Sequence, residues 1–366
     1  MTNNFSDNLK IQNTLNSNLS YDSSQKSVKN SYTGVDFLKL LFAICIIALH
    51  TKALNIFPDI IDYMITRAIF RVAVPYFFVA TGFFLGKKLL VTPKEKYFKV
   101  IWSYCLRLLK PLVVFETISL IYYGLNFLGS GKSIVSTLRI LLRTIIFYPY
   151  GALWFVQACI VGVLLLYPFL RRNKLKLAIT IGIFLYGFAL LANNYSFFII
   201  DTPLQKIINI YLEHCISARN GLFTGFVSIA LGILCSQIHK KVSKRKVFST
   251  LLLLMLFIIY FLEILFVYSF NKEPLDDGAL YISHLFFVPT LFIVTLQINV
   301  PISQKLSLLF RNLSTGVYFL HRPILYVSGY FISTGWVNFG IVLCVAVLIC
   351  LITYKSRFEF LRTLLK

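Results

Sequence analysis

Two ionisable residues, Lys39 and His50, lie eleven positions apart in one apolar segment near the start of the chain. A charge near the centre of a bilayer costs about 2.5–3.5 kcal/mol on insertion scales, so such residues are good indicators of chemistry. Eleven helical steps bring His50 back to within roughly 20° of Lys39, about 16 Å further along the axis. One helix face therefore carries a cation at one end and a titratable base at the other. The alternative is that Lys39 snorkels to water and His50 lies at an interface.

A second apolar segment contains Arg67 and Arg71, one helical turn apart and followed by Pro75. We expect both arginines on one helix face, with the proline loosening the helix after them. Arg71 lies deeper in the segment and has to face protein or water. Its candidate partners are acids in other apolar segments, namely Asp36, Glu116 and Glu263.

Further polar candidates open or interrupt other apolar segments. Trp154 opens one of them, Arg219 and Asn220 open another, and His321 stands beside Arg322 within a third. An interfacial Trp is ordinary, but two adjacent ionisable groups inside an apolar segment are not explained by packing. No GxSxG, HExxH, GxGxxG or Walker signature is present, which argues against hydrolases, metalloproteases and nucleoside triphosphatases. The seven cysteines show no CxxC or Cys/His spacing, so we expect neither a metal site nor disulfides.

The composition is that of a membrane protein. Of the 366 residues 58% are hydrophobic and only 14% are charged, whereas a soluble domain averages about 25% charged residues. The mean hydropathy is +0.76. The net charge of +22 comes from short Lys/Arg clusters between apolar runs, which is the pattern of basic cytoplasmic loops and not of a nucleic-acid-binding face. We therefore expect the lipid bilayer and no nucleic acid as partner.

The apolar runs predict an all-α polytopic helical bundle. About ten of them have the roughly 20 residues that a bilayer core requires: 35–55, 66–86, 98–127, 152–170, 177–193, 219–238, 248–270, 279–298, 313–332 and 336–354. The stretch 136–147 carries two arginines and predicts an interfacial helix. Residues 1–32 are rich in Asn and Ser and predict a disordered cytoplasmic tail, while 355–366 form a basic cytoplasmic tail.

The charges between these runs predict the orientation. If the N-terminus is cytoplasmic, the loops that follow the second, fourth, sixth and eighth spans are cytoplasmic too. These loops and the C-terminal tail hold most of the Lys and Arg, as at Lys94 and Lys241. The opposite gaps hold acids such as Asp59, Asp201 and Asp277. Since cytoplasmic loops are enriched in Lys and Arg, both termini are predicted to be cytoplasmic.

These residues resemble the motifs of the acyltransferase 3 family of integral-membrane proteins. Lys39 and His50 are similar to its basic-x10-His motif, and the run RVAVPYFFVATGF from Arg71 is similar to its second-helix signature, with Thr81 where Ser is usual. The resemblance covers residues 33 to 354. Within the family, the chain most resembles the membrane domain of VanT-type serine racemases, through 34–37, 153–155, 218–223 and 317–321. The sequence stops at Lys366, twelve residues after the last predicted span, so we expect no racemase domain.

The resemblance implies transfer of an acyl group, commonly acetyl, from cytoplasmic acyl-CoA to a hydroxyl on an extracytoplasmic glycan or lipid. It places the protein in a bacterial plasma membrane and leaves acceptor and oligomeric state open. It implies His50 as general base and Arg71 as a catalytic cation. The implied acyl-CoA contacts are Lys39, Asp36 and His321, and the implied acceptor contacts are Trp154, Arg219 and Asn220.

Two other functions remain open. The membrane domains of VanT-type proteins are assigned to serine uptake, so a small-molecule permease is the alternative; Asp36, Arg71 and Arg219 would then contact a zwitterion. A non-catalytic membrane partner of another enzyme is the third reading. The presence of both Lys39 and His50 favours the transferase, because a permease has no evident need for a base aligned with a cation.

Overall fold

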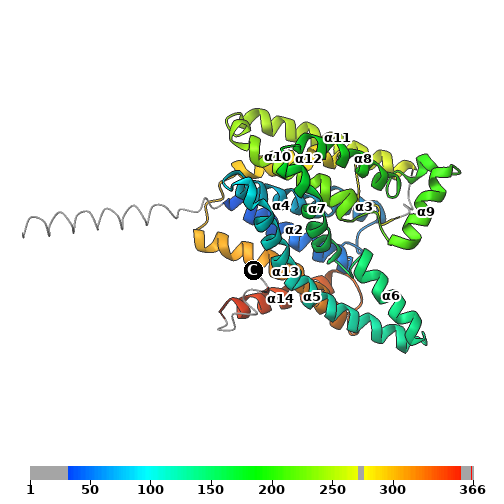
Figure 1. The fold of residues 1–366 in the computed structure, drawn as a ribbon. Coiled ribbons are helices and arrows are strands. Elements are labelled where there is room, and N and C mark those ends of the chain that lie inside the picture. Colours follow the sequence, from blue (N-terminus) through cyan, green and yellow to red (C-terminus); the bar gives the residue numbers. More distant parts are fainter. Residues whose placement is uncertain (1–31, 271–275, 356–363, 365–366) are drawn as a thin grey trace, which may run out of the picture.

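The fold is known from a computed structural model, which describes residues 32–270, 276–355 and 364. The described residues form helices joined by short loops, with no strand among them. Figure 1 shows α2, α4 and α7 in the middle of the bundle, with α8 and α11 along one side and α5, α6 and α14 along the other.

Ten helices coincide with the ten predicted spans. They are α2 (Thr33–Thr51), α4 (Ala73–Leu90), α5 (Tyr97–Gly129), α7 (Trp154–Arg171), α8 (Leu175–Leu191), α10 (Phe226–Val242), α11 (Lys246–Phe270), α12 (His284–Gln297), α13 (Gln304–Ser328) and α14 (Trp336–Lys355). Three more helices have 10 to 14 residues: α3 (Asp59–Ala68), α6 (Ile134–Phe147) and α9 (Pro203–Cys215). Of these, α6 coincides with the predicted interfacial helix.

The prediction of an all-helical protein with several membrane-spanning helices is confirmed. Among the described residues, seven helical segments are long and apolar enough to cross a membrane, and α8 and α12 are apolar but shorter. Helix α13 meets neither description; it begins at Gln304, earlier than the predicted 313, and carries polar residues along its first half. The number of ten spans and the cytoplasmic termini therefore stay predictions.

Small residues allow α4 and α10 to pack closely side by side. Gly82 of α4 faces Gly232 of α10, and a Cβ built at Gly82 would lie 2.9 Å from the Gly232 Cα atom and overlap the carbonyl oxygen of Ile229. One turn further along, Gly86 meets Ser236 in the same way. This small-xxx-small pattern on both helices is a typical contact between membrane helices, because it lets the two backbones approach.

Helices α2 and α13 run parallel and carry several of the candidate residues. Near their starts, Asp36 accepts hydrogen bonds from Ser307 and Arg311. Near their ends, the ring of His50 stacks on that of His321. The start of α2 contacts the start of α13, and the region near the end of α2 contacts the region near the end of α13. The two contacts therefore fix the register of one helix against the other.

The segment around Arg71 differs from the single helix that we expected. Helix α3 ends at Ala68, a 3-10 turn follows at Phe70–Val72, and α4 begins at Ala73. The break precedes Pro75 and includes Arg71, the residue whose carbonyl group a proline at position 75 would clash with in a continuous helix. Pro75 lies in the first turn of α4, where a missing N–H leaves no helical hydrogen bond unmade. Arg67 and Arg71 are therefore on different elements.

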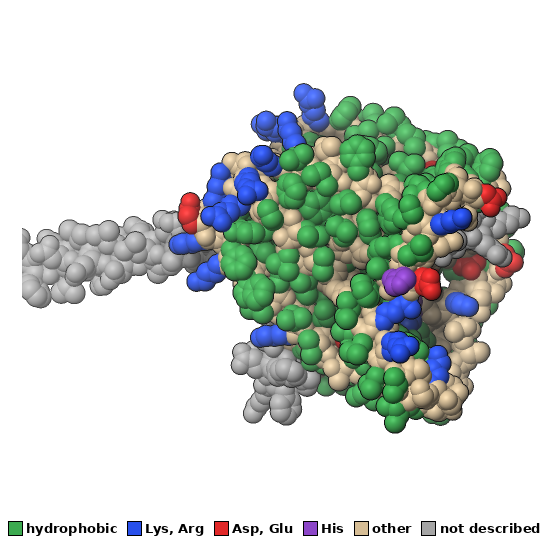
Figure 2. Space-filling model, turned by 45° about the vertical axis from the view of Figure 1, so that its right-hand side comes forward, with side chains coloured by type: hydrophobic (Ala, Val, Ile, Leu, Met, Phe, Trp, Pro, Cys, Tyr) green, Lys and Arg blue, Asp and Glu red, His purple; other side chains and the backbone are tan. Residues whose placement is uncertain are grey.

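The two ends of the bundle differ in charge. Figure 2 shows many Lys and Arg side chains together at one end, hydrophobic side chains over the middle, and both acidic and basic side chains at the other end. We call the first the basic end; α2 begins there and α4 finishes there, with Tyr32 bonded to Lys87. The middle includes α11, whose exposed side chains are mostly apolar, as at Leu251, Leu254, Ile258 and Leu262. A surface of this kind suits contact with lipid chains.

Candidate active site

A cavity of about 350 Å³ opens between α2, α4, α5, α7 and α13 toward the basic end. Its cationic lining residues are Lys39, Arg107 and Arg311, and its hydroxyl groups come from Thr81, Tyr104 and Ser314 among others. The remaining wall is largely apolar, with Phe77, Phe155 and Leu108. A mostly apolar cavity with a few converging polar groups is the usual form of a small-molecule site. We call it the basic-end cavity.

Two predicted acyl-CoA contacts, Lys39 and Asp36, line this cavity, but only the Lys39 side chain is free of polar partners among the described residues. Asp36 is 2% exposed, and its carboxylate accepts from the Arg311 Nε atom at 3.0 Å, the Arg311 Nη2 atom at 2.8 Å and the Ser307 hydroxyl at 2.7 Å. No described residue forms a hydrogen bond or ion pair with the Lys39 ammonium. Lys39 can thus take an anionic ligand, whereas Asp36 holds Arg311 at the cavity wall.

Aromatic rings in tilted and edge-to-face contact close the cavity on the side away from the basic end. Phe77, Phe155 and Tyr318 line the cavity and contact one another, with ring centroids 5.8–6.3 Å apart. Behind them, Phe78 packs on Phe155 at 4.6 Å and on Trp154 at 6.3 Å. We call these five rings the aromatic partition. Tyr318 is fixed within it by a hydrogen bond from its hydroxyl to the carbonyl oxygen of Ala152.

The predicted base His50 lies beyond the partition, in contact with α13. Its ring stacks on His321, with centroids 5.3 Å apart and planes at 21°. The Arg322 Nη1 atom lies 3.5 Å from the His50 Nδ1 atom, at the long limit of a hydrogen bond, and Arg322 Nη2 donates to the Tyr123 hydroxyl at 3.3 Å. His321 follows Tyr318 by three residues, so the histidine pair lies about one helical turn beyond the cavity wall.

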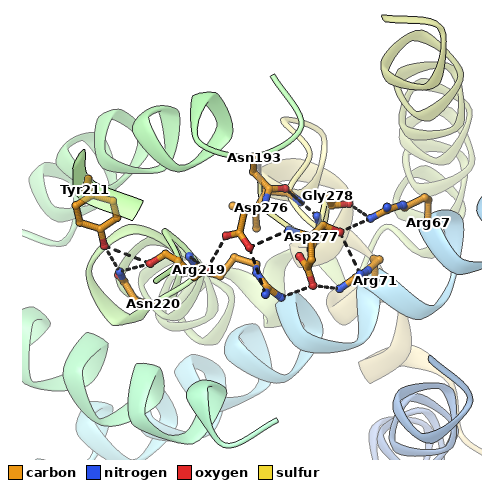
Figure 3. A network of polar contacts seen from close by, with 12 residues as sticks. Arg67, Arg71, Asn193, Tyr211, Arg219, Asn220, Asp276, Asp277 and Gly278 are labelled. Atoms are coloured by element: carbon orange, nitrogen blue, oxygen red, sulfur yellow. Dashed lines mark hydrogen bonds and ion pairs between the residues drawn. The ribbon is translucent and has the colours of Figure 1, made fainter. Parts of the chain in front are cut away.

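At the end opposite the basic end, arginines converge on one aspartate, as Figure 3 shows. The Arg71 Nη1 atom lies 2.6 Å and the Arg219 Nη1 atom 2.8 Å from the same Asp277 Oδ2 atom. Arg67 and Arg71 also donate to the backbone oxygen of Asp277. Asp276 lies 3.6 Å from the Arg219 Nη2 atom and accepts from Ser217. The prediction that Arg71 pairs with Asp36, Glu116 or Glu263 is therefore wrong.

Charge pairing sets the ionisation of this network. Burial raises the pKa of Asp277, but Arg219 and Arg71 outweigh that effect and hold the pKa below its usual value. Burial likewise lowers the pKa of Arg219, but Asp277 and Tyr148 outweigh it, so that the pKa lies above its usual value. Arg219 is therefore cationic and Asp277 anionic at neutral pH.

A second, smaller cavity of about 50 Å³ lies next to this network. Arg71, Arg219 and the predicted acceptor contact Trp154 line it, together with His284. The Arg219 guanidinium lies over the ring of Trp154 at 5.1 Å. The Nε atoms of both arginines, one carboxylate oxygen of Asp277 and both ring nitrogens of His284 are buried without a hydrogen-bond partner. Because buried polar groups are normally paired, this cavity suits a small polar ligand or water.

Asn220, also predicted to contact the acceptor, lies beside this cavity and not in its lining. Its side-chain oxygen accepts from the N–H groups of Leu222 and Phe223, at the start of the π-helical turn Gly221–Gly225. Its amide nitrogen donates to the Tyr211 hydroxyl at 2.7 Å and to the Ser217 carbonyl. The structure thus gives Asn220 a capping role, and its contact with an acceptor stays a prediction.

The structure brings the predicted residues together in three places: Asp36 and Lys39 at the basic-end cavity, His50 and His321 beyond the partition, and Arg71, Trp154 and Arg219 at the small cavity. Sequence reasoning did not assign Arg311, Arg322 or Asp277 to a site. The adjacent ionisable pair of His321 and Arg322 was a signal for Arg322. Nothing in the sequence distinguished Asp277 from the other acids in the loops. Within the described part of the chain, no group of three His, Cys, Asp or Glu residues could hold a metal ion.

Comparisons with known proteins agree with this picture. The family model Acyl_transf_3, described as an acyltransferase domain, matches residues 32–355. An amino-acid racemase of Enterococcus faecalis is 26% identical over 302 residues, which are 82% of this chain and 42% of that protein. A serine/alanine racemase of Enterococcus gallinarum is 26% identical over 257 residues, which are 69% of this chain and 36% of that protein. The chain thus spans less than half the length of these relatives. No solved structure matches it.

Proposed function

The chain belongs to the acyltransferase 3 family, and on that premise we propose that it is a membrane-embedded O-acyltransferase. It takes an acyl group, most simply acetyl, from cytoplasmic acyl-CoA and transfers it to a hydroxyl on an extracytoplasmic glycan or lipid. His50 is the general base, and the membrane is a bacterial plasma membrane. The basic end of the bundle faces the cytoplasm, in line with the enrichment of Lys and Arg in cytoplasmic loops.

One observation carries this proposal: a cationic cavity and a histidine lie on the same helix, on the two sides of an aromatic partition. Lys39 lines the cavity, and His50 lies eleven residues further along α2, about 16 Å along the axis. The pantetheine arm of CoA is long enough to bridge such a separation. The nucleotide can therefore stay at the basic end while its thioester reaches the histidines.

The cavity is suited to hold the CoA phosphates. Lys39, Arg107 and Arg311 supply three cations, and hydrogen bonds between such groups and phosphate are strong. In the closed partition seen here, Phe77, Phe155 and Tyr318 separate the cavity from the histidines. We propose that these rings move apart when the arm enters, and that they keep water from the thioester otherwise.

The network around Asp277 is proposed to form the acceptor side. Arg71 and Arg219 are held in place by Asp277 and keep unpaired Nε–H groups beside the small cavity. In the proposed reaction these cations orient the acceptor and offset negative charge that develops on the thioester carbonyl. Trp154 offers an aromatic surface at the same place.

The first test is binding of acetyl-CoA to the detergent-purified protein by calorimetry. We expect saturable binding by the wild type, weakened at least tenfold in Lys39→Ala and unchanged in Lys176→Ala, which removes an exposed lysine outside the cavity. Absence of binding at millimolar acetyl-CoA, with the protein shown to be folded, would contradict the proposal.

A permease for a small zwitterion such as serine is the second candidate. The small cavity favours it, since unpaired donors of Arg71 and Arg219 and an unpaired oxygen of Asp277 are groups that could bind a carboxylate and an ammonium. The names of the relatives, amino-acid racemase and serine/alanine racemase, point to the same class of molecule. Proteoliposomes separate the two functions, because a transferase releases CoA from acetyl-CoA and a permease accumulates labelled serine.

A further inference from the structure

The three cations that line the basic-end cavity differ in how their charge is balanced. Arg311 donates two hydrogen bonds to the Asp36 carboxylate, which compensates its charge. No described residue forms a hydrogen bond or ion pair with Lys39 or Arg107. The charges that act on Lys39 are those of Asp36, Arg311 and Arg107, and the first two offset each other. The cavity therefore presents two uncompensated cations, Lys39 and Arg107, to a ligand.

Arg107 packs on an aromatic ring at the cavity wall. Its guanidinium carbon lies 5.4 Å from the centroid of the Tyr104 ring, which also lines the cavity. The Tyr104 hydroxyl donates to Thr81 at 3.3 Å, and this hydrogen bond fixes the ring. A ring face attracts a cation but carries no net charge, so the guanidinium keeps its charge and its donors for a ligand. A planar fork of donors of this kind matches the oxygens of a phosphate group.

The two cations lie at different depths in the cavity. Helix α5 starts at the basic end, because only residues 91–96 separate it from the end of α4. Its residues 111–129 contain no Lys or Arg and extend about 28 Å, close to the roughly 30 Å of a bilayer core. Arg107 precedes this apolar part and is exposed, whereas Lys39 is half-buried. Arg107 therefore stands at the mouth of the cavity, and Lys39 lies further inside.

We propose that Arg107 binds the 3′-phosphate of CoA and thereby selects acyl-CoA over acyl donors that lack this phosphate. The inference rests on the proposed function and specifies the donor that its cavity accepts. In CoA the pantetheine arm is joined to the pyrophosphate, and the 3′-phosphate lies beyond the pyrophosphate on the ribose. With the thioester directed toward His50, the pyrophosphate is nearest to Lys39, and the 3′-phosphate lies closer to the mouth, at Arg107.

This assignment distinguishes two classes of acyl donor. A carrier protein presents its acyl group on phosphopantetheine, which has a phosphate next to the arm but no 3′-phosphate. Such a donor can contact Lys39 but leaves Arg107 without a ligand. Hydrogen bonds between an arginine and a phosphate are roughly twice as strong as those between neutral groups, so the missing contact lowers the affinity.

Two ligands that differ only in the 3′-phosphate test the inference. Binding of acetyl-CoA and of acetyl-3′-dephospho-CoA is measured by calorimetry on the detergent-purified full chain. We expect the wild type to bind acetyl-CoA about tenfold more tightly, which is the effect of one hydrogen bond between charged groups. Arg107→Gln should weaken the binding of acetyl-CoA about tenfold and change that of the dephospho ligand less than about twofold, because only the contact with the 3′-phosphate is lost.

Two further variants are the controls. Lys39→Ala should weaken both ligands by the same factor, because both contain the pyrophosphate. Arg171→Gln should change neither, because Arg171 is also an exposed arginine next to a tyrosine, Tyr167, but does not line the cavity. Thermal unfolding without ligand verifies that each variant is folded.

The opposite results separate this inference from the proposed function. Equal affinity of the wild type for the two ligands would overturn the inference and leave the transferase function standing, and this comparison does not depend on the folding of any variant. Equal weakening of both ligands in a folded Arg107→Gln variant would overturn it too, since Arg107 would then act on a part that the ligands share. Failure of the folded wild type to bind either ligand would overturn both the inference and the proposed function.

Discussion

The carboxylate of Asp36 and the guanidinium of Arg311 form a two-pronged ion pair across α2 and α13. Both contacts are short, 3.0 Å to Nε and 2.8 Å to Nη2, and the aspartate is almost fully buried. This pair sets the register in which α2 presents Lys39 to the cavity and His50 to His321. The proposed donor site and base therefore both depend on an ion pair that contacts neither the base nor the acceptor side.

Replacing Asp36 by Asn should destabilise the protein. Removing one partner of a buried pair costs about 3–5 kcal/mol, because the remaining charge is left unpaired. Arg311 is partly exposed, which lowers the expected loss to about 2–3 kcal/mol. Denaturation in detergent measures it. The double variant Asp36→Asn, Arg311→Met should recover part of the loss, while Lys39→Ala should weaken acetyl-CoA binding without changing stability. A stable Asp36→Asn variant would show that the pair does not hold the two helices.

Gly82 is expected to tolerate no side chain. A Cβ there would overlap the carbonyl oxygen of Ile229 on α10, which is backbone and cannot move aside. Gly82→Ala should therefore separate α4 from α10 and abolish folded protein in size-exclusion profiles. Gly187→Ala on α8 is the control, because nothing lies within 4 Å of its added Cβ and the change favours the helix by roughly 0.5–1 kcal/mol. Equal behaviour of the two variants would contradict the close approach of the helices.

The periodicity of apolar runs was sufficient to predict where the helices lie. Runs of about 20 apolar residues have few structures open to them in a bilayer, so each of the ten predicted segments proved to be helical. The break between α3 and α4 was missed because Ile69 and Phe70 are as apolar as a continuous helix requires. The start of α13 was missed because Ser307 and Arg311 are polar for reasons of pairing, which hydropathy does not register.

The candidate site was predictable only along single helices. Lys39 and His50 lie on one helix, and helical geometry alone relates them. The convergence of Arg71 and Arg219 on Asp277 joins residues more than 50 positions apart, and no local pattern encodes such a meeting. The same holds for the stacking of His50 on His321, which joins residues of α2 and α13 that are far apart in the sequence.

The network at Asp277 predicts a pH dependence of stability. Because the folded pKa of Asp277 is held below the unfolded value of about 3.9, its contribution is complete above that pH and is lost as the pH falls through the folded value. Asp277 is 36% exposed, so we expect only about 1–2 kcal/mol. Asp277→Asn should lower the midpoint of thermal unfolding at pH 7. The difference from wild type should shrink below pH 4; a constant difference down to pH 3 would contradict the ion pairs.

Substitutions of Asn220 distinguish a role in capping the π-helical turn from a role in binding the acceptor. Its side-chain oxygen accepts two backbone N–H groups at the start of the π-helical turn, so Asn220→Ala should cost about 0.5–2 kcal/mol, whereas Asn220→Ser, whose hydroxyl can also cap, should cost less. Thermal unfolding in detergent compares the two. If Asn220 acts only by positioning the neighbouring Arg219, acyl transfer should follow stability and be restored in Asn220→Ser. Loss of transfer in a stable Asn220→Ser variant would instead show that the amide itself contacts the acceptor, as the sequence predicted.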